Sequence, residues 1–193
     1  HSRAQKTVKM VWSRLERGRA ADVSGGVVTL LYLPYALPGS IAALIALALS
    51  SYVFLTRKQH DSPGARTFSG FMLTTGVWSL ATALAALSNY DGQVFWAKVG
   101  YIAITTLPPL WFVFVLQQRG HLNKMLARSL FAIPVLTIFL VWTNDLHNIF
   151  WLKTSFNESV TPPAFETVRG FWFWGVHTLY SYGLLVSSLL LLL

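Results

Sequence analysis

The stretch Ile41-Ala42-Ala43-Leu44-Ile45-Ala46-Leu47-Ala48-Leu49 decides the fold, because all nine of its residues are apolar. It lies within a longer, mainly apolar segment that runs from about Leu30 to Leu55. A helix needs roughly 20 apolar residues to cross the hydrocarbon core of a bilayer. Alanine and leucine also have high intrinsic helix propensities. The segment is therefore predicted to be a membrane-spanning helix.

Four further apolar stretches follow along the chain. They run from about Phe68 to Leu87, from Val94 to Leu116, from Leu126 to Trp142, and from Phe171 to Leu193. None shows the strict alternation of apolar and polar residues that is typical of a membrane barrel strand. The predicted fold class is therefore all-α, a polytopic transmembrane helix bundle with five spans. Pro108-Pro109 and Pro134 are expected to kink the third and fourth spans, because proline lacks the backbone N–H.

The composition supports a membrane protein. Of the 193 residues, 54% are hydrophobic and 11% are charged, whereas about 25% are charged in an ordinary soluble domain. The eight tryptophans suit a protein that needs interfacial anchors. The absence of cysteine excludes disulfides, thiolate metal sites and cysteine nucleophiles from this chain.

The positive charge follows membrane topology. The formal net charge is +8, but residues 1–27 hold six basic and two acidic residues, and the other charges lie mainly in short loops. We therefore predict the lipid bilayer as a partner and no nucleic acid. Basic residues mark the cytoplasmic side, so the basic loops 57–66 and 117–127 are predicted to be cytoplasmic. Loop 88–93, without basic residues, and loop 145–170 would then lie outside, as would the N-terminus of the first span.

Residues 1–27 conflict with this orientation, because a basic segment would lie outside the cell. Either the segment is non-native or an upstream extension, or it is cytoplasmic and a re-entrant piece precedes the first span. We favour the first interpretation, so residues 28–193 are expected to form the transmembrane region. The chain stops within the apolar run Leu189–Leu193, so this region is expected to be truncated at its C-terminal end.

The fourth loop, about residues 145–170, is unusually long and contains several aromatic residues. It is interpreted either as a lid or ligand-contact surface, or as a long surface loop. The candidate ligand-sensing residues in and around it are Lys98, Tyr101, Asp145, His147, Trp151, Trp174 and His177.

Each of these candidates also has a plainer interpretation. Lys98 either pairs with an outer-loop carboxylate, with Tyr101 on the same helix face, or extends to the interface. His147 either senses protons or binds a metal, or is held by the backbone. His177 and Trp174 either line a pocket or belong to an interfacial belt. Asp145, His147 and His177 have no spacing that requires a metal, so no metal site is predicted.

The sequence lacks a phosphate-binding glycine-rich loop, an HExxH motif, a nucleophile elbow and a nucleotide-binding fingerprint. Whether the intact protein is an enzyme stays open from the residues alone. No catalytic residue and no cofactor are predicted for this chain. Few polar groups interrupt the centres of the spans, which weakens the interpretation as a transporter or permease fragment. A structural subunit of a membrane complex is a third possibility.

Four groups of residues carry a resemblance to a known family. They are Gly70-Phe71-Met72-Leu73 with Val77-Trp78-Ser79-Leu80; Phe95-Trp96-Ala97-Lys98-Val99-Gly100-Tyr101-Ile102 with Leu107-Pro108-Pro109-Leu110-Trp111-Phe112; Thr143-Asn144-Asp145-Leu146-His147 with Trp151; and Gly170-Phe171-Trp172-Phe173-Trp174 with Tyr180-Ser181-Tyr182. With them, residues 28–193 resemble the N-terminal seven-transmembrane-helix sensor region of bacterial histidine kinases. The five spans would be the first five of seven.

The resemblance implies a multi-pass protein of the bacterial inner membrane. It would receive a small-molecule or membrane signal and relay it to cytoplasmic domains beyond this chain. Those domains imply a protein-histidine kinase that uses ATP and Mg²⁺, a homodimer, and a response regulator as partner of a two-component system. A diguanylate cyclase output is the alternative.

Overall fold

The computed structural model describes residues 31–56, 64–120 and 123–193. The predictions for residues 1–27 and for most of loop 57–66 concern residues outside these ranges. The five predicted spans are confirmed, since five described helices are long and apolar enough to cross a membrane. They are Leu31–Thr56, α2 (Ala65–Ala86), α3 (Tyr90–Gln118), Lys124–Trp142, which comprises α4 (Lys124–Ser129) and α5 (Ala132–Trp142), and Trp172–Leu192, which comprises η1 (Trp172–Thr178) and α7 (Leu179–Leu192).

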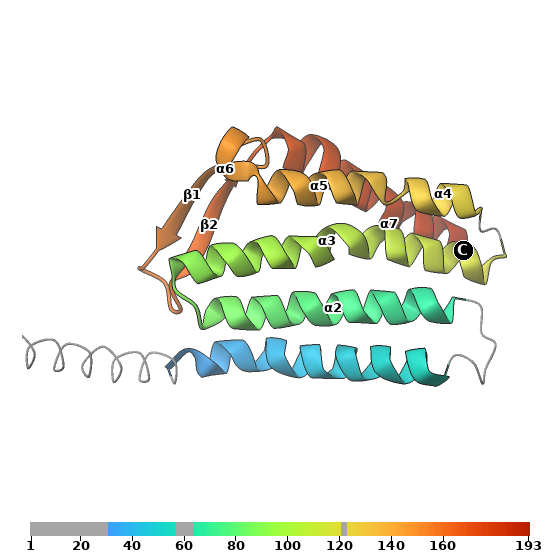
Figure 1. Ribbon diagram of the computed structural model, residues 1–193, viewed down its shortest axis with the longest axis horizontal. Coiled ribbons are helices and arrows are strands. Elements are labelled where there is room, and N and C mark those ends of the chain that lie inside the picture. Colours follow the sequence, from blue (N-terminus) through green and yellow to red (C-terminus); the bar gives the residue numbers. More distant parts are fainter. Residues whose placement is uncertain (1–30, 57–63, 121–122) are drawn as a thin grey trace, which may run out of the picture.

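The helices lie side by side, with α3 in the middle of the bundle (Figure 1). Helices α2, α5 and α7 all pack on α3. The short helix α6 (Asn144–His147) and two strands lie at one end, which we call the hairpin end. The C-terminus lies at the opposite end (Figure 1). Helix α3 is thus the element that joins the two sides of the bundle.

Small residues let the first helix and α2 approach closely. The Ser50 hydroxyl donates to the Ser69 carbonyl at 2.8 Å, and the Ser69 hydroxyl donates to the Ser50 carbonyl at 2.9 Å. A Cβ at Gly76 would lie only 2.8 Å from the Leu47 side chain. Without a hydrophobic driving force in lipid, close packing and such interhelical hydrogen bonds hold spans together.

The two proline sites behave differently. Helix α3 continues as one helix through Pro108 and Pro109, whereas the fourth span is interrupted between α4 and α5. Pro134 offers no N–H to the Leu130 carbonyl, which lies in this interruption. The Tyr180 hydroxyl of α7 donates to that carbonyl instead. A neighbouring helix therefore satisfies the carbonyl that proline leaves free, as membrane bundles require.

The fourth loop differs from its prediction, because most of it forms a β-hairpin. Strand β1 (Trp151–Asn157) pairs antiparallel with β2 (Ala164–Arg169), with Phe156 opposite Phe165. The hairpin base leaves no room for a side chain at Gly170, where a Cβ would lie 2.1 Å from the Ile149 carbonyl oxygen. The region is therefore an ordered element that holds a fixed place at the hairpin end.

Candidate functional site

Asn144 holds the entrance of the hairpin. Its side chain is only 2% exposed. The amide oxygen accepts hydrogen bonds from the backbone N–H groups of Phe150 at 3.1 Å and Trp151 at 2.9 Å, and its nitrogen donates to the Trp151 carbonyl at 3.0 Å. These bonds replace ladder partners that the backbone lacks where β1 begins. The turn from α6 into β1 is thereby fixed.

Gln93 of α3 holds the other end of the hairpin. Its side-chain nitrogen donates to the Pro163 carbonyl at 2.7 Å, and its oxygen accepts from the Phe165 N–H at 2.7 Å. The Tyr90 and Thr154 hydroxyls lie 3.1 Å apart, within hydrogen-bond distance. Both strands are therefore attached to the first turn of α3.

An aromatic cluster lies beneath the hairpin. Phe150 and Trp151 are 0% and 2% exposed and pack with Phe173. The Tyr101 ring meets Phe150 edge-on at a centroid distance of 4.9 Å and Trp151 at 5.6 Å. Edge-on pairs at such distances add stability beyond the area that they bury. This cluster joins the hairpin, α3 and η1.

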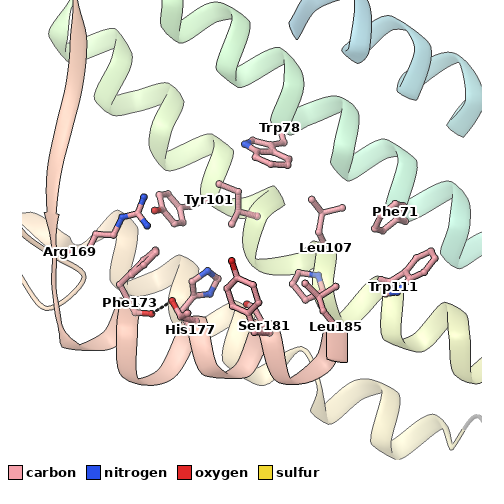
Figure 2. A pocket seen from close by; sticks show the side chains of 14 residues that line it. Phe71, Trp78, Tyr101, Leu107, Trp111, Arg169, Phe173, His177, Ser181 and Leu185 are labelled. Atoms are coloured by element: carbon pink, nitrogen blue, oxygen red, sulfur yellow. Dashed lines mark hydrogen bonds between the residues drawn. The ribbon is translucent and has the colours of Figure 1, made fainter. Parts of the chain in front are cut away.

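A cavity of about 650 Å³ begins beside this cluster and extends between α2, α3 and the fifth span. We call it the lateral groove. It is lined by Phe71, Trp78, Tyr101, Ile104, Leu107, Pro108, Trp111, Arg169, Phe173, His177, Thr178, Ser181, Tyr182 and Leu185. Figure 2 shows Arg169, Tyr101 and Phe173 at one end of it and Phe71 with Trp111 at the other. Its volume falls within the range of about 300–1,000 Å³ that is usual for small-molecule sites.

Few polar groups face the groove, and two of them are buried in the fifth span. His177 is 5% exposed and Ser181 is 8% exposed. His177 lies in η1, a π-helical segment in which the Thr178 hydroxyl donates to the Phe173 carbonyl at 2.7 Å. Such segments are frequent at functional sites. The Ser181 hydroxyl has no hydrogen-bond partner among the described residues.

Arg169, the last residue of β2, supplies the positive charge at the hairpin end of the groove. Its guanidinium carbon lies 4.2 Å from the centre of the Phe173 ring and 6.0 Å from that of Trp174. Within the described part of the chain, no carboxylate forms a salt bridge with it. The groove therefore has a positively charged mouth and an apolar length.

The structure brings two of the seven predicted candidates, Tyr101 and His177, into the groove, with ring centroids 6.4 Å apart. Trp151 packs against Tyr101 from the hairpin side. Trp174 is 59% exposed and does not line the groove. These placements leave the ligand-sensing role of the candidates as a prediction.

The other three candidates lie at α6 and on the face of α3 toward it. Lys98 Nζ lies 2.9 Å from Asp145 Oδ2, which is the pairing that the sequence offered as one interpretation. His147 Nδ1 accepts from the Ile149 N–H at 3.0 Å, and its Nε2 lies 3.1 Å from the Thr143 hydroxyl. Among the described residues, no three His, Asp or Glu side chains come together as a metal site would need.

Sequence reasoning missed Arg169 and Ser181 as parts of the site. Arg169 lies within the fourth predicted loop, and its place at the groove depends on the hairpin. Ser181 was noted only within the residues of the family resemblance. Ser181 could have been recognised from its hydroxyl, because a polar group at membrane depth usually faces the interior of a bundle.

Comparison with known proteins identifies a family. The family model for the N-terminal 7TM region of histidine kinase covers residues 39–193. No curated protein and no solved structure shows significant similarity to the chain. The match covers most of the chain, including the greater part of the first helix, the other four membrane helices of the described residues, the hairpin and the lateral groove. The chain therefore belongs to the family of N-terminal seven-transmembrane regions of histidine kinases.

Proposed function

We propose that this chain is the membrane-embedded signal-sensing region of a bacterial sensor histidine kinase. It relays a signal from the extracytoplasmic side or from the bilayer to cytoplasmic domains that are not part of the chain. Those domains would bind ATP and Mg²⁺ and transfer a phosphoryl group to a response regulator, in a homodimer. The family supports the class of protein, and the lateral groove supports reception at the membrane.

The groove is the observation that carries the proposal. A ligand shifts an equilibrium between two helix arrangements only by its different affinity for each. An occupant of the groove contacts α2, α3 and α7 together. Helices α2 and α7 both pack on α3, so an occupant between them favours the arrangement in which they stand apart. That change in spacing is what cytoplasmic domains would receive.

The loop charges support the orientation in which the hairpin end is extracytoplasmic. The hairpin then faces the signal, while the far end of α7 points toward the output domains. A diguanylate cyclase is the alternative output of the same sensor, and the coding sequence that follows Leu193 distinguishes the two. A phospho-acceptor helix with an ATPase domain supports the kinase, and a GGDEF-type domain supports the cyclase.

The test is autophosphorylation of the full-length protein in lipid nanodiscs. Leu185→Trp places a large side chain in the groove, and Leu190→Trp places the same side chain on α7 outside the groove lining. We expect Leu185→Trp to change the autophosphorylation rate severalfold and Leu190→Trp to leave it near the wild-type rate. Equal rates in all three proteins would contradict the proposal that the groove controls the output.

A further inference from the structure

The lateral groove has a polar end and an apolar end. Arg169 lies at the hairpin end beside Tyr101 and Phe173, whereas Leu107 and Trp111 lie farther along (Figure 2). The groove thus passes from a cationic mouth to a hydrocarbon-like interior within one continuous cavity. A ligand that matches this profile has a charged head and an apolar tail.

Among the described residues, no carboxylate balances the charge at the mouth. The salt bridge among the described residues joins Lys98 to Asp145, and no described carboxylate pairs with Arg169. The Arg169 guanidinium makes cation–π contacts with the rings of Phe173 and Trp174. A guanidinium binds planar anions through paired N–H donors, which makes it well suited to a carboxylate. The expected head group is therefore anionic.

A second observation points to a ligand in the same place. The Ser181 hydroxyl oxygen is buried and lines the groove without a hydrogen-bond partner among the described residues. A buried hydroxyl that lacks a partner has lost its hydrogen bonds to water without replacement, which is unfavourable. His177 lies one turn earlier and lines the same wall. These groups offer hydrogen bonds to a polar atom that lies below the charged mouth.

The groove is accessible from the side of the bundle. At its rim, Trp78 of α2 and Leu185 of the fifth span are 43% and 41% exposed. An amphiphile can enter through this opening between the described helices. The groove volume of about 650 Å³ is that of a small-molecule site. A groove of this size favours a ligand with one acyl chain over a lipid with two.

From these observations we infer that the lateral groove binds a single-chain amphiphile with an anionic head group, such as a long-chain carboxylate. The head lies at Arg169, and the tail runs along Trp78, Leu107 and Leu185. As a signal for the kinase, this ligand depends on the proposed function, but its binding is measured independently of phosphorylation.

The experiment uses the full-length protein in nanodiscs and photoactivatable hexadecanoic acid with a diazirine in its chain. We expect crosslinks to peptides of α3 and α7 that contain Leu107 and Leu185. Arg169→Gln is expected to lower the apparent affinity about tenfold, because hydrogen bonds to charged groups contribute about that much to binding. The matched hexadecanol probe should bind more weakly and should be insensitive to Arg169→Gln.

Two matched controls make the result specific. Arg128→Gln removes an arginine that does not line the groove, so it should leave labelling unchanged. Leu185→Trp should abolish labelling of the groove by both probes, whereas Leu190→Trp should not. Unchanged hexadecanol binding by Arg169→Gln shows that this substitution leaves the groove intact.

Three results would overturn the inference. The first is labelling spread evenly over the lipid-facing helices, and the second is equal labelling by acid and alcohol. The third is a groove that the fatty-acid probe does not label. This result is expected if another span of the full-length protein covers the groove. It is also expected if the groove takes a two-chain lipid, which a photoactivatable phosphatidylglycerol would show by labelling it. If the groove is unlabelled but Leu185→Trp still alters autophosphorylation, the sensor function stands and the ligand class fails.

Discussion

At the scale of single residues, Asn144 and Gln93 do similar work at the two ends of the hairpin. Each is buried, and each uses one side-chain amide to satisfy several backbone groups. An amide suits this role because it carries both donors and an acceptor. Backbone groups that β1 and β2 cannot pair within the hairpin are thereby paired at the membrane helices.

Asn144→Ala should destabilise the protein by about 3 kcal/mol or more, because each buried polar group that loses its partner costs about 1–3 kcal/mol. The N–H groups of Phe150 and Trp151 and the carbonyl of Trp151 all lose their partner. The measurement is the free energy of unfolding in mixed detergent micelles, together with proteolysis of the hairpin.

Asn157→Ala is the matched control for that measurement. Its side chain bonds Glu166 and Ser159 in the exposed turn of the hairpin, where water can replace the protein partners. Its effect should be about 0.5 kcal/mol or less. If the two variants were equally stable, Asn144 would not be the anchor of the hairpin.

At the scale of elements, the break between α4 and α5 is coupled to α7. Pro134 removes the backbone donor for the Leu130 carbonyl, and the Tyr180 hydroxyl replaces it. The fourth span can therefore bend without leaving a carbonyl unsatisfied in lipid. The contact also fixes α7 relative to the fourth span.

This coupling predicts a non-additive pair of substitutions. Tyr180→Phe should destabilise the wild-type protein by about 0.6–1 kcal/mol, the usual size of an interhelical hydrogen bond in membranes. In a Pro134→Ala background the restored N–H can bond Leu130 itself, so Tyr180→Phe should cost much less there. A double-mutant cycle of unfolding free energies measures the difference. Purely additive effects would show that the hydroxyl serves another purpose.

The elements also show what sequence could and could not predict. The five spans were predictable because bilayer thickness imposes length and apolarity on each helix independently of its neighbours. The hairpin was not, because its strands of seven and six residues lack clean alternation. Gln93, about 70 residues away in sequence, is part of what holds it.

The candidate site shows the same difference between properties that are visible along the chain and those that depend on the folded structure. The structure places Tyr101 and His177 in the groove, and both were candidates from local sequence, His177 as a polar group within an apolar span and Tyr101 through its i+3 spacing from Lys98. Arg169 was missed because only the folded hairpin carries its charge to the groove. Residues whose role depends on tertiary placement give no local signal.

At the scale of the whole molecule, the proposed topology is open to a direct test. These 193 residues contain no cysteine, so a cysteine introduced here is the only one among them. Ser159→Cys lies in the hairpin turn, and Lys124→Cys lies at the opposite end of the bundle. A membrane-impermeant maleimide applied to intact cells should label the first variant and not the second. Labelling of the second alone would reverse the proposed orientation and place the hairpin in the cytoplasm.

The attachment of the hairpin to α3 also determines when, during synthesis of the chain, the hairpin end can assemble. Gln93 leaves the ribosome about 70 residues before its partner Pro163. At synthesis rates of about 5–20 residues per second, that gap lasts roughly 4–14 s. During this interval the third span is made, but the amide of Gln93 has no hairpin to bind. Final assembly of the hairpin end must therefore wait until the segment after the fourth span has been translated and has returned to the start of α3.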